Sequence, residues 1–212
     1  MEWGSLTIWR IQNVPLRIHL SVLFGIAFMG LYLNLHFARS YSGWSQEQQF
    51  LASAIGALFI WVCVLAHELG HFVVLRDLKR PVDNITLFAL GAYVSPSDSE
   101  ENTWRRDKAG EEIVISVAGP LVNIIIAALL LLGFYVPSED TAFLSGLLQA
   151  GIRINLLLGL FSLLPLVFCD GGRIIYDVFA WLTNSEKIGL VAYVLGSIAT
   201  IGAFIAGFRM LP

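Results

Sequence analysis

Long runs of apolar residues constrain this chain more than any other feature. Of its 212 residues, 57% are hydrophobic and 14% are charged, whereas soluble domains have about 45–50% and about 25%. A bilayer core of about 30 Å needs about 20 apolar residues per helix. Five segments meet this length, at about residues 18–37, 50–75, 113–136, 142–164 and 188–208. The sequence therefore predicts an integral membrane protein and excludes a soluble globular one.

The segments between these runs complete the predicted fold class. Residues 171–181 are too short to span a bilayer and are expected to form an interfacial helix. Residues 5–20 are expected to be a strand or an amphipathic lead-in, and the charges that precede the first apolar run argue against a signal peptide. We therefore predict one all-α polytopic membrane domain over residues 1–212, with about five transmembrane helices and a small membrane-associated β region.

Charge and cysteine content narrow the functional classes. The formal net charge is −3 and the basic residues are scattered along the chain, which argues against nucleic acid as a partner. The two cysteines, Cys63 and Cys169, both lie in apolar surroundings and provide no disulfide framework.

The distribution of Lys and Arg predicts the orientation of the chain, because cytoplasmic loops carry an excess of these residues. With the N-terminus inside, Arg39 and Arg209 fall outside and Arg153 falls within the fourth run. The inside segments then hold Arg10, Arg17, Arg76, Lys79, Arg80, Arg105, Arg106, Lys108, Arg173 and Lys187. This bias predicts that those segments and the N-terminus face the cytoplasm.

Residues 67–71 are His-Glu-Leu-Gly-His and lie inside the second apolar run. In a helix, positions i and i+4 share a face, so His67 and His71 can present both imidazoles to one metal ion. Glu68 can then lie beside a metal-bound water, as in zinc hydrolases. The alternative is a pair of histidines that only line a helix interface. Three ionisable groups within five residues of a membrane helix are costly, however, and favour a functional role.

A catalytic zinc site is expected to have a third protein ligand and to leave one position to water. Asp170 is a good candidate, because it is the only acid between Asp140 and Asp177 and follows an apolar run. Gly171 and Gly172 permit a sharp turn that can aim its carboxylate inward. An isolated Asp-Gly-Gly sequence, by contrast, usually marks a turn that faces solvent.

Several short motifs also occur in a fixed order along the chain. Residues 67–71 match a His-Glu-x-x-His helix, and residues 162–165 (Ser-Leu-Leu-Pro) and 169–172 (Cys-Asp-Gly-Gly) are similar to an Asn-Leu-Leu-Pro and Leu-Asp-Gly-Gly signature. Three further segments fit the same pattern: residues 13–19, 87–92 and 118–123. In this order the motifs resemble the site-2 protease family of intramembrane zinc metalloproteases, in a compact form without a PDZ domain or a C-terminal regulatory domain.

The resemblance implies one Zn²⁺ per chain, held by His67, His71 and Asp170, with Glu68 as general base. It implies hydrolysis of peptide bonds in or near transmembrane segments of protein substrates, with a regulatory membrane partner as a further expectation. A prokaryotic plasma (inner) membrane, with the active site toward the cytoplasm, is the expected location. The implied three-helix catalytic core corresponds to about residues 50–75, 113–136 and 142–164.

Two departures from the family pattern leave an alternative open. Ser162 stands where the family usually has Asn, a candidate contact for the oxyanion or the substrate, and its shorter hydroxyl can donate only one hydrogen bond. The alternative is therefore a catalytically weak or inactive membrane adaptor. Cys169 replaces the usual Leu, and its thiolate is a weaker candidate for the third ligand than Asp170.

A few other residues carry secondary predictions. Asn123 and Asn155 are polar within apolar runs, and we interpret them as packing across helices, with indirect support of the site. Arg153 either marks the end of a broken helix or snorkels toward an interface. Residues 82–94 are either an interfacial loop or a strand that pairs with an extended substrate. The candidate pairing residues in that strand are Ile85, Leu87, Phe88 and Gly91.

Overall fold

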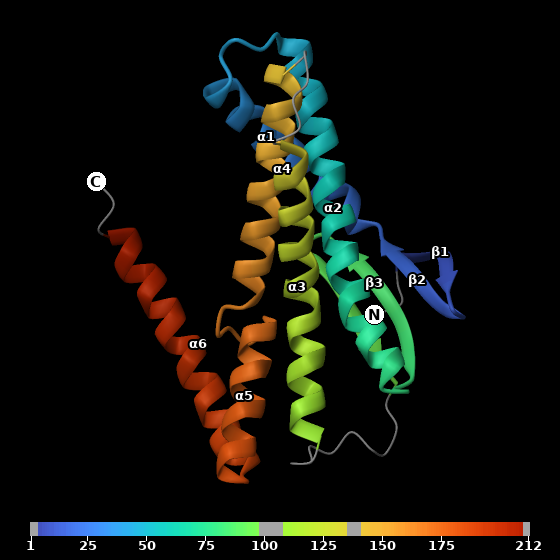
Figure 1. The fold of residues 1–212 in the computed structure, drawn as a ribbon, viewed down its shortest axis with the longest axis vertical. Helices are drawn as coiled ribbons and strands as arrows, with labels where there is room; N and C mark the ends of the chain where they lie inside the picture. The colour runs from blue at the N-terminus through green and yellow to red at the C-terminus, as the bar shows by residue number, and fades with distance from the viewer. Residues whose placement is uncertain (1–3, 98–107, 135–140, 210–212) are drawn as a thin grey trace.

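A computed structural model describes residues 4–97, 108–134 and 141–209 of the chain, and Figure 1 shows its helices and its small sheet. The helices are α1 (Ser21–Ser40), α2 (Gln46–Asp77), α3 (Ala109–Phe134), α4 (Thr141–Ser162), α5 (Asp170–Thr183) and α6 (Glu186–Arg209). All except α5 contain a stretch long and apolar enough to cross a membrane. The predicted membrane fold with five spans and a short additional helix is therefore confirmed.

The helix that carries the His-Glu-Leu-Gly-His motif has a well-defined start. At the N-terminus of α2, the Ser45 hydroxyl accepts a hydrogen bond from the Gln48 backbone, and the Gln48 side chain accepts one from the Ser45 backbone. This capping box satisfies two backbone donors that would otherwise lack partners. From this cap α2 runs for 32 residues, which at 1.5 Å per residue exceeds the bilayer core. Its C-terminal part therefore carries the motif toward one membrane surface.

The four strands form one mixed sheet beside the helices (Figure 1). They are β1 (Ser5–Ile11), β2 (Val14–His19), β3 (Val82–Phe88) and β4 (Gly91–Pro96), in the order β1-β2-β3-β4. The outer pairs are antiparallel, and β2 and β3 pair in parallel. Both segments for which the sequence left a strand as one of two alternatives are therefore strands. The sheet is anchored to α1 and α2 by a shared apolar cluster: Val14, Leu16, Val22, Trp61, Phe72, Ile85 and Leu87.

The helices pack around α3, which contacts α2, α4 and α5. α1 lies against α2, and α6 lies against α5. In Figure 1, α6 leaves α5 and slopes away from α4 toward its C-terminal end. At the opposite end of the molecule from α5, the rings of Tyr41, Trp44 and Phe143 form an aromatic cluster. Such a cluster is typical of a membrane interface.

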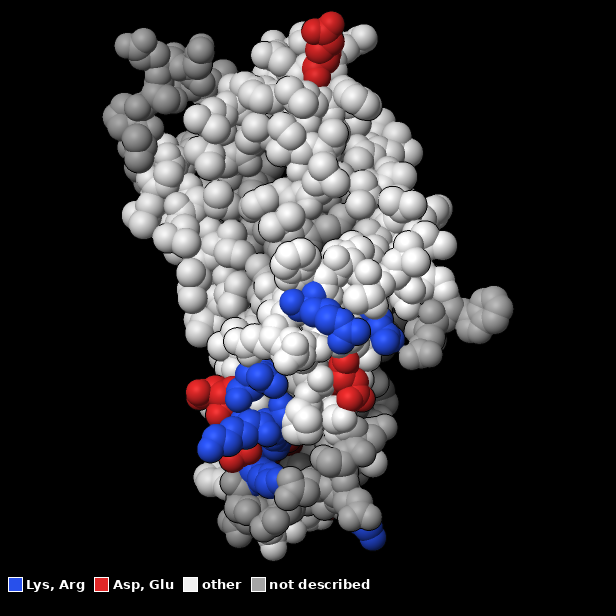
Figure 2. All heavy atoms as spheres, turned by 90° about the vertical axis from the view of Figure 1, so that its right-hand side faces the viewer, with Lys and Arg blue, Asp and Glu red and all other residues white. Residues whose placement is uncertain are grey.

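Charged side chains gather at one end of the molecule. In the view of Figure 2, most of the Lys, Arg, Asp and Glu side chains lie in the lower half, and the upper half shows only an acidic group at its tip. At this end the Arg80 guanidinium forms ion pairs with Glu112, at 2.5 Å, and with Glu111, at 3.4 Å. These pairs tie the segment after α2 to the start of α3. Arg105 and Arg106, which the sequence places on the same side, lie outside the described residues.

Candidate metal centre

Two histidines of α2 face the same point. His67 and His71 are four residues apart in a continuous helix, so their side chains project from one face. Their ring centroids lie 4.9 Å apart, and their Nε2 atoms lie 3.2 Å apart. The helical spacing therefore produces the paired imidazoles that the sequence predicts.

Asp170 joins this pair from a segment that lies 103 residues after His67. Its carboxylate oxygens lie 3.1 Å from His67 Nε2 and 3.4 Å from His71 Nε2. One ligand atom from each residue lies within 4.8 Å of the other two. The three side chains are only 9–13% exposed. The structure thus brings all three predicted metal ligands together in a largely buried cluster that could hold a metal ion.

The two glycines after Asp170 allow this approach. A Cβ atom on Gly171 would collide with the carbonyl of Leu163, and one on Gly172 would collide with the carbonyl of Leu166. Because neither residue has a side chain, α5 can begin directly against the turn that follows α4. That contact fixes the position of Asp170, which is the first residue of α5.

A glycine of α3 closes the cluster from the third side. A Cβ atom on Gly119 would overlap the imidazoles of both His67 and His71. α3 therefore passes closer to the metal-binding face of α2 than any residue with a side chain would permit. The sequence gives no local sign of this role, because the contact depends on how two helices pack.

A chain of buried hydrogen bonds leads from His67 into the membrane domain. His67 Nδ1 lies 2.6 Å from Asn123 Oδ1, and the Asn123 amide donates to Asn155 Oδ1 at 3.1 Å. The Asn155 amide donates in turn to the Gly151 carbonyl, at 2.9 Å, and to Cys63 Sγ, at 3.2 Å. Both asparagines are 0% exposed. They pack across helices, as the sequence predicts, and Asn123 also contacts a candidate metal ligand.

The Gly151 carbonyl, at the far end of this series of hydrogen bonds, fixes the donor and acceptor of each bond in it. The carbonyl of Gly151 can only accept, so Asn155 must present its NH₂ group there and its oxygen to Asn123. Asn123 must then donate its own NH₂ group and present its oxygen to His67. His67 is left to carry its proton on Nδ1, with a lone pair on Nε2. His71 reaches the same state more directly, because its Nδ1 lies 2.7 Å from the Ile115 carbonyl.

These hydrogen bonds make the cluster suited to a cation. Two imidazole lone pairs and a carboxylate converge within 4.8 Å, and no proton lies between them in this tautomeric state. Three electron-rich groups held this close need a positive charge to offset their repulsion. A His, His, carboxylate set is one of the donor combinations of catalytic zinc sites. The donor set therefore fits Zn²⁺.

The remaining predicted site residues differ in their relation to this cluster. Glu68 is half-buried and interacts electrostatically with His71, His67 and Asp170, and it forms no hydrogen bond or ion pair within the described parts of the chain. The Ser162 hydroxyl donates to the carbonyl of Gly159 in its own helix, at 2.9 Å. It is therefore not held toward the cluster by any described contact.

The candidate substrate-pairing residues lie in two different strands. Ile85 and Leu87 belong to β3, which pairs with β2 on one side and with β4 on the other. Their backbone groups have neighbours on both sides, so β3 cannot be the strand that accepts an extended peptide. Phe88 ends β3, and Gly91 begins β4. The free edges of the sheet are β4 and β1. The prediction is therefore wrong for Ile85 and Leu87, and within residues 82–94 only the part that belongs to β4, from Gly91 onward, lies at a free edge.

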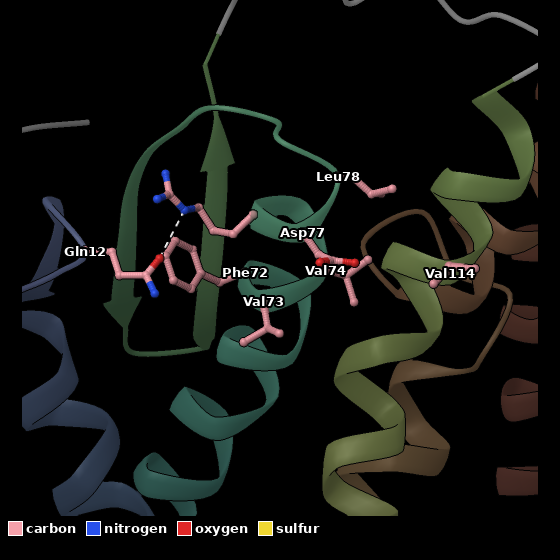
Figure 3. A pocket seen from close by; sticks show the side chains of 8 residues that line it. Gln12, Phe72, Val73, Val74, Asp77, Leu78 and Val114 are labelled. Atoms are coloured by element: carbon pink, nitrogen blue, oxygen red, sulfur yellow. Dashed lines mark hydrogen bonds between the residues drawn. The ribbon is translucent and has the colours of Figure 1, made fainter.

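A separate cavity of about 520 Å³ lies between the β1–β2 turn, the C-terminal end of α2 and the start of α3. Figure 3 shows the hydrogen bond from Arg76 to Gln12, at 3.2 Å, on one side of this cavity, with Phe72, Asp77 and Val114 around it. None of the three clustered ligands lines it. The cavity is therefore distinct from the candidate metal centre.

Comparison with known proteins matches this chain to a peptidase family and to zinc metalloproteases. Residues 55–150 match the family model of peptidase family M50. A zinc metalloprotease of Methanocaldococcus jannaschii is 30% identical over 179 residues, which cover 83% of this chain and 46% of that protein. A relative from Synechocystis is 29% identical over 67% of this chain and 36% of its own length. The chain thus spans less than half the length of these curated relatives.

The solved structure of a site-2 protease from Methanocaldococcus jannaschii has the same fold. It superposes with a TM-score of 0.60 and 24% sequence identity, over 97% of this chain and 86% of that one. The match extends over nearly all of the membrane domain and its small sheet.

Proposed function

Since this chain belongs to the site-2 protease family, peptidase family M50, we propose that it is an intramembrane zinc metalloprotease. Its substrates are membrane proteins, cut within or close to a transmembrane segment. The observation that carries this proposal is the convergence of His67, His71 and Asp170 beside Glu68. The chain acts as one membrane domain over residues 1–212, with α2, α3 and α4 as its catalytic core.

His67, His71 and Asp170 would hold one Zn²⁺ in this proposal. When bound, the ion supplies Lewis acidity that polarises the scissile carbonyl and lowers the pKa of a water molecule. The hydrogen bonds of Asn123 and of the Ile115 carbonyl keep both imidazoles turned toward the site. Partners of this kind typically raise the affinity of a site for its metal.

Glu68 is the general base. It follows His67 directly on α2, so its carboxylate lies next to the cluster and need not act as a ligand. No described hydrogen bond or ion pair occupies it, which leaves it free to take a proton from water. It then delivers that proton to the leaving amine. Burial of the cluster limits competing water, which strengthens these electrostatic interactions.

The substrate must be locally extended before it is cut, because the amides of a transmembrane helix are engaged in internal hydrogen bonds. The free edge of β4, from Gly91 to Pro96, is positioned to hold such an extended segment by strand addition. N-methyl groups at alternate backbone positions of a peptide substrate test this. Methylation of the amides that face β4 should raise KM, and methylation of the amides between them should not. Equal effects at all positions would exclude strand addition.

The expected setting is a prokaryotic inner membrane with the metal centre toward the cytoplasm. The orientation rests on the bias of Lys and Arg toward one end of the molecule (Figure 2). A regulatory membrane partner would control the access of substrates to such a site.

The first experiment is the zinc content of the detergent-purified chain, measured beside Asp170→Asn and Glu68→Gln. We expect about one zinc per chain in the wild type and in Glu68→Gln, and much less in Asp170→Asn. Vesicles that contain the chain and a transmembrane substrate then report cleavage, which Glu68→Gln and a zinc chelator should both abolish. A wild type that takes up no zinc when zinc is supplied would exclude the protease mechanism.

The membrane adaptor remains as a second candidate because of one observation. The Ser162 hydroxyl is bound to the Gly159 carbonyl, so an oxyanion donor at this position would have to give up that bond. Loss of one such donor costs about 10²–10³ in rate. Zinc binding without any Glu68-dependent cleavage would favour the adaptor.

A further inference from the structure

A single arginine lies on the outer surface of the fourth span. Arg153 is exposed on α4, and it forms no hydrogen bond or ion pair with any described residue. Its neighbours on the same side of the helix are apolar and exposed, with Leu157 at 67% and Leu160 at 61%. We propose that this face of α4 binds a transmembrane helix of a partner subunit through a carboxylate that pairs with Arg153.

The depth of Arg153 makes its charge costly. The candidate span runs from Phe143 to Ser162, so Arg153 lies about 14–15 Å from either end at 1.5 Å per residue. Gly146 packs against the ring of Trp44 in the aromatic cluster, and Arg153 lies about 10 Å deeper than that level. Lys and Arg near helix ends can snorkel, so that their charged groups reach the membrane interface. At mid-span, a charged side chain is expected to have a partner.

The face that carries Arg153 points away from the metal centre. Gly151, Asn155 and Gly159 are buried on the side where α4 contacts α2 and α3. Arg153 is two residues from Gly151 and from Asn155, which places it about 200° around the helix from both. A helix bound to this face would not bring its backbone to the cluster. The occupant is therefore a partner subunit and not the segment to be cut.

The described residues of this chain offer no suitable carboxylate for Arg153. Among the described residues of the five spans, the acids lie at helix ends, with the exception of Glu68 at the metal centre. The described spans of a second copy therefore supply no acid at this depth. α6, the neighbouring span in Figure 1, lies against α5 and slopes away from α4. The complementary partner is a different membrane protein with Asp or Glu near the middle of its span.

The test uses the full chain in phosphatidylcholine vesicles with synthetic Leu/Ala transmembrane peptides as probes. The peptides carry Asp, Asn or Leu at their centre, and energy transfer between labelled chain and labelled peptide reports association. The wild type should bind the Asp peptide about five- to thirty-fold more tightly than the Leu peptide. Arg153→Leu should lose this preference, and Arg153→Lys should retain part of it. Leu157→Ala, on the same face, is the matched control and should keep it.

Three results would overturn the proposal. Equal binding of the Asp and Leu peptides by the wild type would mean that Arg153 does not pair with a carboxylate of the bound helix. An unchanged preference in Arg153→Leu would place the contact elsewhere. Cleavage of the Asp peptide by the wild type, absent in Glu68→Gln, would identify the occupant as a substrate. Zinc content confirms that each variant is folded. The association measurement does not depend on protease activity, so a failure of this proposal can be distinguished from a failure of the proposed function.

Discussion

The protonation of two imidazoles decides whether the cluster can bind a metal ion. Each histidine has its Nδ1 fixed by an acceptor, which leaves Nε2 as the ligand atom. His71 depends on a backbone carbonyl, which no substitution removes. His67 depends on two asparagine side chains, which are costly to bury in a membrane unless they are fully hydrogen-bonded. The amide of Asn155 is thus linked to a ligand that it does not touch.

Asn155→Leu tests this link. The substitution removes the group that orients the Asn123 amide, so Asn123 can rotate and His67 is no longer held in one tautomer. We expect the zinc affinity to fall about 10–100-fold, as for other residues that orient metal ligands. Competition with a calibrated chelator measures it.

Cys63→Ala is the matched control, because Cys63 only accepts from the far side of Asn155 and the Gly151 carbonyl still orients that amide. Its zinc affinity should stay close to that of the wild type. The same affinity in Asn155→Leu as in the wild type would show that Asn155 only packs.

Ser162→Asn tests whether this position limits the reaction. The longer amide can reach beyond the Gly159 carbonyl that now holds the hydroxyl, and it can donate to developing negative charge. We expect kcat to rise by up to about 10²-fold with zinc content unchanged. Ser162→Ala should change kcat little, because the present hydroxyl is already engaged. A rate that falls in Ser162→Asn would mean that the serine suits this site as it stands.

Among the elements, the close approach of α3 to α2 restricts the geometry of the site. Gly119→Ala introduces a methyl group where both imidazoles now lie. Either α3 must move away or the histidines must rotate, and we expect zinc binding to be lost or weakened by at least about tenfold. Gly133→Ala lies in the same helix with no atom near its added Cβ, and it should leave zinc content unchanged. Normal zinc binding by Gly119→Ala would contradict the geometry of the cluster.

The elements also show which features a sequence can predict. Each predicted span lies within four residues of the observed helix, because bilayer thickness sets the length of an apolar run. Asp170 could be predicted as the third ligand because it is the only acid between Asp140 and Asp177, and because the two glycines that follow it indicate a turn. The strands could not be separated from loops, since β3 is stabilised by β2 from a distant segment. The pairing of β3 on both sides and the contact of Gly119 depend on packing, which leaves no local pattern.

At the scale of the whole molecule, the metal centre lies off the middle of the membrane domain. His67 and His71 lie in the last third of α2, and Asp170 begins the short helix that continues beyond α4. The charged end of the molecule (Figure 2) also holds the end of α2 and the start of α3, where Arg80 pairs with Glu111 and Glu112. Water and an extended segment would thus reach the site from this end, past the sheet.

The orientation can be tested with cysteines placed at the two ends of the molecule. Lys187→Cys, exposed at the start of α6, should react with a membrane-impermeant maleimide only after cells are permeabilised. Ser42→Cys, exposed between α1 and α2, should react in intact cells. The unsubstituted chain gives a low background, because Cys63 and Cys169 are buried. The reverse labelling pattern would place the metal centre toward the outer surface. Its substrates would then have to be cut from that side, which the bias of Lys and Arg argues against.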